Sequence, residues 1–387
     1  MRVLLAFDKF KDALSARQAC ASAAAALRSA HPDWTLDTCP LTDGGEGFAE
    51  ILTEAARGRW PAVQVAGPRG RPLATRFGLV SLGSIPASAR ALLDLPATLA
   101  PESTVALVEM AAASGLALLP PAERDPWQTT TLGTGELIRE AAAAGAKLIV
   151  LGVGGSATND LGLGALSALG LRFLSAAGDV VASPIPSRWP EIARINGHLH
   201  PPLPPIRIAC DVSNPLLGPH GAAAIYGPQK GLRAGDLDRL ETGSRRLATL
   251  LCAHAGRPAA LMDQPGAGAA GGIAFGLMAA AGAQLLPGAD FVAAWLDLGS
   301  RLAAADLVLT GEGTFDQSSL SGKGPGALVA RALARGKAVH VFAGRLGRLA
   351  PTPPALHLHA ITPAGMPLPE ALSAAPQLLG AAVTAAF

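Results

Sequence analysis

The feature that most constrains this chain is a repeated order of short apolar strand, polar loop and helix at its amino-terminal end. A strand is predicted over residues 2–7 and is followed by a polar loop. Ser15 and Gln18 then form an S-x-x-Q capping box, which predicts the start of a helix. A second strand over 35–39 leads into the polar segment 42–47 and a further helix. This order is typical of a parallel α/β sheet, whose ligands gather at the carboxyl ends of the strands.

The same order of elements returns near the carboxyl terminus. A strand is predicted over 305–310, a helix near 324–334 and another strand over 338–342. The chain has 387 residues, more than the roughly 250–300 at which one hydrophobic core stops growing. We therefore predict two domains, the first built from both termini around a middle domain.

The middle of the chain carries its own pattern. The turn 67–70 separates the extended segments 63–65 and 74–80 and predicts an antiparallel hairpin. A helix over 134–144 and a strand over 147–152 follow, so this part is expected to be mixed α/β.

Composition excludes several classes of protein. The 31 Lys and Arg residues nearly balance the 29 Asp and Glu residues, so the chain lacks the excess positive charge that is typical of proteins that bind nucleic acid or an anionic membrane. Half of the residues are hydrophobic and only 16% are charged, so the chain is not disordered. The four cysteines are scattered, and neither the apolar run 3–7 nor the tail 371–387 is long enough for a signal-peptide core or a membrane span. We expect a cytoplasmic protein.

Acidic residues follow several of the predicted strands and turns. Carboxylates at strand ends are suited to hold Mg²⁺ or to accept a proton from a substrate hydroxyl. The alternative for each one is an ordinary cap of a helix or turn, and four such places in one chain weaken that alternative for the set. The residues are Asp8, Asp43 with Glu46, Asp211 with Asn214, and Glu312 with Asp316.

The segment Gly-Val-Gly-Gly-Ser-Ala-Thr-Asn-Asp at residues 152–160, called the glycine loop below, follows a predicted strand and precedes a helix. Adjacent glycines let backbone N–H groups approach an anion, and a helix N-terminus adds positive potential. The alternative is a tight glycine turn with ordinary helix caps. The phosphate-binding candidates in this loop are Gly154, Gly155, Ser156, Thr158 and Asn159.

Four lysines lie in predicted loops beside glycine or acidic residues, namely Lys9, Lys11, Lys230 and Lys323. Each is suited to neutralise a phosphate or a substrate carboxylate, and the alternative for each is a solvated surface lysine.

A second glycine cluster, at 266–271, fits the G-x-G-x-x-G pattern of dinucleotide-binding proteins, with Asp290 about twenty residues beyond. That fingerprint requires a strand running into its first glycine, whereas Pro265 and the polar pair before it precede this one. A glycine-rich helix start is the favoured interpretation.

Taken together, these segments resemble the bacterial glycerate kinase family of the type I class. The resemblance covers nearly the whole chain in the right order, although any one motif would be weak evidence. The matching segments are 7–16, 43–47, 109–116, 129–136, 152–160, 211–217, 227–231, 266–272 and 311–313. Two departures are that the family commonly has a small residue where this chain has Asp12, and a neutral residue where it has Lys9.

The resemblance implies ATP-dependent phosphorylation of D-glycerate with Mg²⁺, with 2-phosphoglycerate the favoured product and 3-phosphoglycerate the alternative. It also implies a flavodoxin-like or Rossmann-like parallel-sheet domain made from residues 1–75 and 300–387. An inserted mixed α/β domain over 76–299 completes the expected fold, with the active site in the cleft between the two domains. We expect the partners to be small molecules only, and the chain to be a monomer or a homodimer.

Site roles follow from the same resemblance. Asp8, Asp43 and Glu46 are candidates for the base that accepts the hydroxyl proton, and the choice among them stays open. The other roles are as follows: Lys11 and Lys9 hold the glycerate carboxylate, Asn214 contacts substrate, Asp211 or Glu312 holds Mg²⁺, Gly154 to Asn159 cradle phosphates, and Lys230 or Lys323 offsets their charge.

Two other functions are carried as alternatives. One is an NAD(P)-dependent oxidoreductase that uses the 266–271 glycine cluster. The other is a non-catalytic sugar-acid-binding protein.

Overall fold

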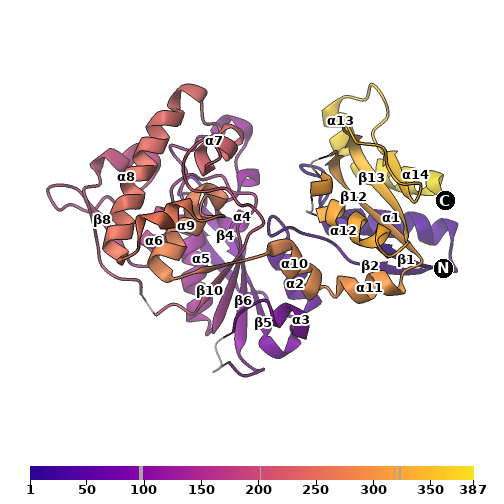
Figure 1. The fold of residues 1–387 in the computed structure, drawn as a ribbon, viewed down its shortest axis with the longest axis horizontal. Helices are drawn as coiled ribbons and strands as arrows, with labels where there is room; N and C mark the ends of the chain where they lie inside the picture. The colour runs from indigo at the N-terminus through magenta and orange to yellow at the C-terminus, as the bar shows by residue number, and fades with distance from the viewer. Residues whose placement is uncertain (96–98, 201, 318, 322–323) are drawn as a thin grey trace. The chain divides into compact units, whose positions relative to one another are not determined.

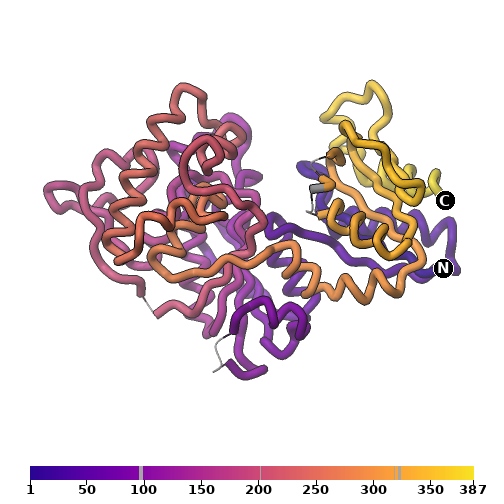
Figure 2. The backbone as a smooth tube through the Cα atoms, in the orientation of Figure 1, coloured from indigo at the N-terminus to yellow at the C-terminus, as the bar shows by residue number. Residues whose placement is uncertain are grey.

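The computed structural model describes residues 1–95, 99–200, 202–317, 319–321 and 324–387, which form two compact units (Figure 1). One unit comprises Met1–Asp43 and Val292–Phe387, and the other comprises Gly44–Phe291. Both termini therefore belong to one unit, as the course of the chain in Figure 2 shows. The chain first leaves this unit after Asp43, whereas the sequence analysis placed the first boundary at residue 75.

The terminal unit is built on one five-stranded sheet in which every pair of neighbouring strands is parallel. Counted within the unit, the strand order is 2-1-3-4-5, the doubly wound order of flavodoxin-like folds. The predicted α/β class with a parallel sheet is confirmed. In spatial order the strands are β2 (Thr35–Thr38), β1 (Arg2–Leu5), β12 (Leu307–Phe315), β13 (Ala338–Leu346) and β14 (Leu356–Ala360).

Helix α1 begins where the sequence predicts. The Ser15 hydroxyl accepts a hydrogen bond from the Gln18 backbone N–H at 3.2 Å, and the Gln18 side chain accepts one from Ser15 N–H at 2.9 Å. The helix then packs against α14, and both cover the face of β1 that presents Val3 and Leu5. The helices of this unit are α1 (Ala16–Ala30), α11 (Leu298–Ala304), α12 (Gly324–Leu333), α13 (Leu368–Ser373) and α14 (Ala375–Ala386), with the short 3-10 turn η8 (Ser319–Ser321).

The inserted unit has a second five-stranded sheet, parallel except for its edge strand β5. The predicted extended segment 74–80 divides at Phe77, because its first part pairs with β3 in the expected hairpin and its second part joins the sheet. The sheet order is β11 (Gln284–Leu286), β10 (Ile206–Ala209), β7 (Leu148–Gly152), β6 (Thr104–Glu109) and β5 (Gly78–Ser81), and the hairpins are β3 (Ala62–Ala66) with β4 (Pro72–Arg76) and β8 (Arg172–Leu174) with β9 (Arg194–Asn196).

Helix α2 explains why the chain enters this unit so early. Although it follows the polar segment 42–47 of the terminal half, it packs on β5 and β6 of the inserted sheet. The longer helices here are α2 (Phe48–Ala55), α5 (Leu132–Ala143), α8 (Leu237–Ala255), α9 (Ala269–Ala281) and α10 (Gly288–Trp295). The residues of α10 from Val292 onward belong to the terminal unit. The short ones are α3 (Ala87–Arg90), α4 (Ala111–Ser114), α6 (Leu163–Ala168), α7 (Ala222–Tyr226) and the 3-10 turns η1 (Leu82–Ser84), η2 (Leu116–Leu118), η3 (Pro121–Glu123), η4 (Pro186–Glu191), η5 (Pro228–Lys230), η6 (Ala234–Asp236) and η7 (Ala259–Asp263).

No helix within the described residues has the length and apolar character needed to cross a membrane.

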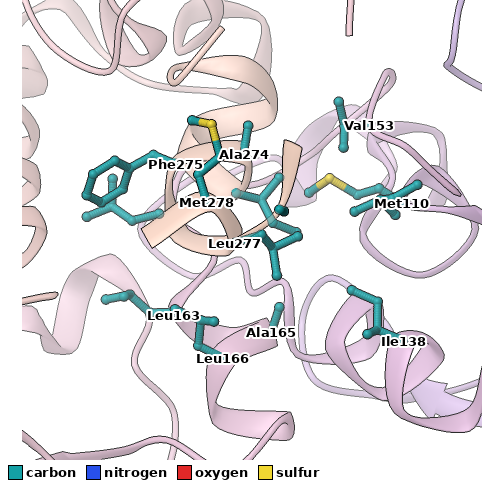
Figure 3. Close-up of a cluster of buried hydrophobic side chains, with 14 of the residues drawn as sticks. Met110, Ile138, Val153, Leu163, Ala165, Leu166, Ala274, Phe275, Leu277 and Met278 are labelled. Carbon is teal, nitrogen blue, oxygen red and sulfur yellow. The ribbon is translucent and has the colours of Figure 1, made fainter. Parts of the chain in front are cut away.

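The core of the inserted unit lies directly beside the glycine loop. Met110 follows β6 and Val153 follows β7, and both are buried in the large apolar cluster. In Figure 3 their side chains lie beside those that α9 contributes, among them Ala274 and Leu277. The loop that follows β7 is therefore anchored at its first residues by close packing of the core.

Candidate active site

Three acidic residues gather at the carboxyl edge of the terminal sheet. Asp8 follows β1, Asp43 follows β2, and Glu312 lies in β12, so their strands are neighbours in the sheet. The strand β12 continues through Glu312 to Phe315, because it pairs with β13 along its whole length, whereas the sequence analysis ended this strand at residue 310. In a doubly wound sheet, ligands bind where the strand order reverses, which here is the carboxyl end of β1 and β12.

The Asp8 carboxyl group has an unusual environment. Burial, followed by the charge of Asp43, raises the pKa of Asp8 to about 7 from its ordinary value of 3.8, and Glu312 adds to the rise. The Lys9 backbone N–H donates to Asp8 Oδ1 at 2.7 Å and, with the Lys9 ammonium group, limits this rise. A carboxyl group with a pKa near neutrality is suited to accept a proton, since a general base works best when its pKa lies near the working pH.

Glu312 completes this acidic group. Burial raises the pKa of its carboxyl group, the charges of Asp316 and Asp43 add to the rise, and a hydrogen bond with Ser319 opposes it. Its Oε1 atom is buried and has no hydrogen-bond partner in the part of the chain that the structure describes. A buried carboxylate oxygen left unpaired is costly, so this atom is a reasonable ligand for a cation.

A Mg²⁺ ion at the carboxyl edge of the terminal sheet would have only one or two protein ligands. Among the described residues, no three Asp, Glu, His or Cys side chains are placed to share one metal ion. Mg²⁺ usually takes one or two carboxylates and completes its shell with waters and substrate phosphates, and Glu312 meets that demand. The other predicted ligand, Asp211, lies in the inserted unit, where its Oδ2 accepts a hydrogen bond from Ala289 N–H at 2.9 Å at the start of α10.

The lysines of the first loop lie near the acidic group. Lys9 is half-buried beside Asp8, and Lys11 is exposed. A side-chain carbon added at Gly313 of β12 would stand 3.3 Å from the Lys11 backbone nitrogen, so this loop runs close to Glu312. Asp12 adopts a left-handed φ of 62°, a conformation that Asp tolerates better than most residues.

The glycine loop packs against residues 44–46, which also belong to the inserted unit. The Gly154 N–H donates to the Gly44 carbonyl at 3.0 Å, and a side-chain carbon at Gly154 would stand 2.6 Å from the Gly45 Cα atom. The Glu46 carboxylate lies next to Gly155, since a side-chain carbon added there would meet its Oε1 at 3.1 Å. The structure thus groups Glu46 with the glycine loop, and it groups Asp8, Asp43 and Glu312 at the edge of the terminal sheet.

Asp160 ends the loop and was not among the predicted site residues. Its fully buried carboxylate accepts hydrogen bonds from the backbone N–H groups of Thr131, Gly162 and Gly164 and from the Thr131 hydroxyl, at 2.8 to 3.2 Å. Burial raises its pKa, and these four donors oppose the rise. The sequence signal for this role is the position of Asp160 directly before an Ala- and Leu-rich segment that starts a helix, where an acidic side chain is suited to accept backbone N–H groups.

Lys230 is buried behind the same loop. Its side chain is 1% exposed, and its Nζ donates to the Thr158 carbonyl at 2.6 Å and to Asn159 Oδ1 at 3.1 Å. Burial lowers its pKa to about 7, and the charge of Asp160 partly opposes this effect. This ammonium group was predicted to offset the charge of a phosphate, whereas in the structure its hydrogen bonds go to residues 158 and 159 of the loop. The other predicted charge-offsetting residue, Lys323, lies outside the described residues.

The Asn214 side chain is held on both sides. Its Nδ2 donates to the His220 carbonyl at 2.7 Å, and its Oδ1 accepts from the Tyr226 hydroxyl at 2.7 Å. Its assignment to substrate stays a prediction.

The second glycine cluster supports the glycine loop. A 3-10 turn, η7, precedes it, so no strand runs into its first glycine among the described residues. Ala270, Gly271 and Gly272 all adopt left-handed φ angles, and a side-chain carbon at Gly271 would stand 1.9 Å from the Thr158 carbonyl oxygen. The Leu161 N–H donates to the Gly271 carbonyl at 3.1 Å. These glycines allow the backbone of the cluster to lie against residues 158–161.

Comparison with known proteins gives one consistent result. A model of the glycerate kinase family matches residues 3–387. A glycerate kinase of Bacillus subtilis is 39% identical over 84% of this chain and 80% of its own length, and a glycerate 2-kinase of Escherichia coli is 36% identical over 84% and 80%. The crystal structure of a putative glycerate kinase 2 from Salmonella typhimurium LT2 superposes with a TM-score of 0.72 at 36% identity, covering 100% of this chain and 97% of that one.

These matches identify a phosphotransferase, so neither the oxidoreductase nor the non-catalytic alternative describes the chain. The resemblance seen in the sequence motifs is confirmed over nearly the full length. The chain belongs to the glycerate kinase family.

Proposed function

We propose that this enzyme transfers the γ-phosphoryl group of ATP to a hydroxyl group of D-glycerate, with 2-phosphoglycerate as the product. The observation that carries the proposal is the acidic group at the carboxyl edge of the terminal sheet, in which Asp8 has a pKa near neutrality. The names of the relatives support glycerate as the acceptor, and one of them is called a glycerate 2-kinase.

Asp8 is the proposed general base among the three candidates. Its Oδ1 accepts the Lys9 N–H, which fixes the carboxyl group and leaves Oδ2 to receive the hydroxyl proton. As the proton leaves, the hydroxyl oxygen attacks the γ-phosphorus and the bond to the β-γ bridging oxygen breaks, giving ADP. Asp43 is assigned the indirect role of raising the pKa of Asp8 through its charge. Glu46 lies beside Gly155, so we assign it to the loop that binds phosphates.

The remaining roles rest on charge and hydrogen-bonding capacity. Lys11 and Lys9 hold the glycerate carboxylate, and Asn214 contacts the substrate. Gly154, Gly155, Ser156, Thr158 and Asn159 present backbone and side-chain donors to the phosphates of ATP. Glu312 or Asp211 would hold Mg²⁺, which when bound shields charge on the transferring phosphoryl group. Phosphoryl transfer depends mainly on such positioning and charge stabilisation.

We further propose that the enzyme is cytoplasmic, binds small molecules only, and is a monomer or a homodimer. The near balance of charges supports the absence of a nucleic-acid partner.

The test replaces each candidate base and measures turnover of ATP and glycerate. Asp8→Asn is expected to lower kcat by about a hundredfold to ten-thousandfold, the usual contribution of a general base. Asp43→Asn and Glu46→Gln are expected to lower it less. Asp12→Asn is the matched control, because it changes an exposed carboxylate in the same loop and Asn also tolerates a left-handed φ. Full turnover in a folded Asp8→Asn enzyme would show that Asp8 is not the base.

A further inference from the structure

A buried lysine in the inserted unit takes no direct part in the proposed chemistry. The Lys230 side chain is 1% exposed, yet its amino group reaches two consecutive residues of the glycine loop. Bringing a lysine out of water is unfavourable unless its hydrogen bonds and charge are compensated. Here the Thr158 carbonyl, the Asn159 side-chain oxygen and the nearby charge of Asp160 compensate it.

The contact with Asn159 determines how its side-chain amide is oriented. Because Oδ1 accepts the Lys230 hydrogen bond, the NH₂ group of the same planar amide points to the other side, away from the lysine. Asn159 is 3% exposed, so its amide cannot turn freely in solvent. Lys230 therefore presents Asn159 as a hydrogen-bond donor rather than an acceptor.

The backbone of the loop is held by independent contacts on each side of this pair. Gly271 leaves room for the Thr158 carbonyl, and Asp160 ties the end of the loop to Thr131 and to the start of α6. The Thr158 hydroxyl oxygen is buried without a hydrogen-bond partner in the part of the chain that the structure describes. The backbone of the loop is thus held on both sides of this pair, and the contact between Lys230 and Asn159 selects the orientation of the Asn159 side chain.

We propose that Lys230 is a positioning residue that orients the Asn159 amide so that its NH₂ group donates to a phosphate of ATP. This inference rests on the proposed function, in which the glycine loop binds the nucleotide. It assigns Lys230 an indirect role in place of the direct phosphate contact expected from the sequence. Its amino group donates hydrogen bonds to the Thr158 carbonyl and to Asn159 Oδ1 of the loop itself, and the Lys230 side chain has almost no exposed surface.

The test is a double-mutant cycle on the affinity for ATP, measured by calorimetry together with kcat and the KM values. Lys230→Met keeps the length of the side chain and removes the donor, and Asn159→Ala removes the amide. Each is expected to weaken ATP binding about tenfold, the usual effect of one hydrogen bond to a charged group. The double variant is expected to bind no more weakly than the weaker single variant, because Lys230 acts through Asn159. The KM for glycerate is expected to change less than twofold.

Arg207 provides a matched control. It is also a buried cation of the inserted unit whose guanidinium donates to two backbone carbonyls, those of Leu93 and Asp94. Arg207→Met is expected to lower the unfolding temperature and to leave the affinity for ATP within twofold of the original. Equal weakening of ATP binding by Arg207→Met and Lys230→Met would mean that general loss of stability explains the effect, and would overturn the proposal.

A third variant covers the case in which Lys230→Met does not fold. Asn159→Asp keeps an oxygen facing Lys230 and replaces the NH₂ group by a second oxygen. If Lys230 faces Asn159 as described, the new carboxylate is paired, so the unfolding temperature stays within a few degrees of the original while ATP binding weakens at least tenfold. Unchanged ATP binding in Asn159→Asp would overturn the inference. Failure of the unaltered enzyme to bind ATP at all would instead refute the proposed function.

Discussion

At the scale of single residues, the arrangement around Asp8 favours proton transfer at the expense of stability. Asp43 is held close enough for its charge to oppose the ionisation of Asp8, and Asp8 is largely removed from water. A carboxyl group with a raised pKa binds a proton more tightly in the folded than in the unfolded protein. Ionisation of Asp8 therefore destabilises the fold while it creates the base.

The pH dependence of stability tests this directly. Because the pKa of Asp8 rises from 3.8 to about 7 on folding, its contribution to the unfolding free energy falls as the pH rises from 4 to 7 and stays low above that range. Asp8→Asn removes this dependence, so the variant is expected to be more stable than the original protein at pH 8 and nearly equal to it at pH 4. Thermal unfolding of both proteins across this range gives the comparison. A variant that is less stable at pH 8 would contradict the raised pKa.

At the scale of structural elements, the glycine loop depends on the left-handed turn that begins α9. Gly271 has a φ of 74°, and no side-chain carbon fits between it and the Thr158 carbonyl. Gly271→Ala is expected to lower the unfolding free energy by about 3 kcal/mol, from backbone strain and overpacking together. ATP binding should weaken as well, since residues 158 and 159 must move. Chemical denaturation and calorimetry measure the two effects.

The control for this substitution is Gly299 in α11. It has open space around it and a φ outside the left-handed range, so Gly299→Ala is expected to raise the unfolding free energy by about 0.5–1 kcal/mol through higher helix propensity. If both substitutions changed the unfolding free energy by equal and small amounts, the close packing of α9 on the glycine loop would not be required for stability.

Several elements were predictable because their signals are local. The Ser15–Gln18 capping box predicted the start of α1. The second strand was predicted over 35–39, and β2 runs over Thr35–Thr38. The extent of β12 was not predictable, because the segment Gly-Glu-Gly at 311–313 looks like a loop in the sequence, and only the pairing of Gly311, Glu312 and Thr314 with β13 makes it part of the strand. Lys230 was predicted to face a phosphate, because the Gly, Pro and Gln residues directly around it are typical of a loop.

At the scale of the whole molecule, the sequence predicted two α/β parts and the contribution of both termini to one of them. The structure has two compact units, one of which contains both termini, and the change of unit after Asp43 falls inside the motif 43–47 and carries no break in composition. The gathering of Asp8 with Glu312 depends on strand order, which brings residues about three hundred positions apart onto neighbouring strands. Both acids are visible in the sequence, but no local sequence pattern shows that they lie close together.

The central claim is that this chain moves the γ-phosphoryl group of ATP to the C2 hydroxyl of D-glycerate. The most direct measurement is the proton-coupled ³¹P NMR spectrum of the product formed from ATP, Mg²⁺ and D-glycerate. A phosphate on C2 has one neighbouring proton and is expected to give a doublet, whereas a phosphate on C3 has two and would give a triplet. The account predicts a new doublet that grows in step with ADP. ADP formed without any phosphoglycerate signal, or no consumption of ATP, would contradict it.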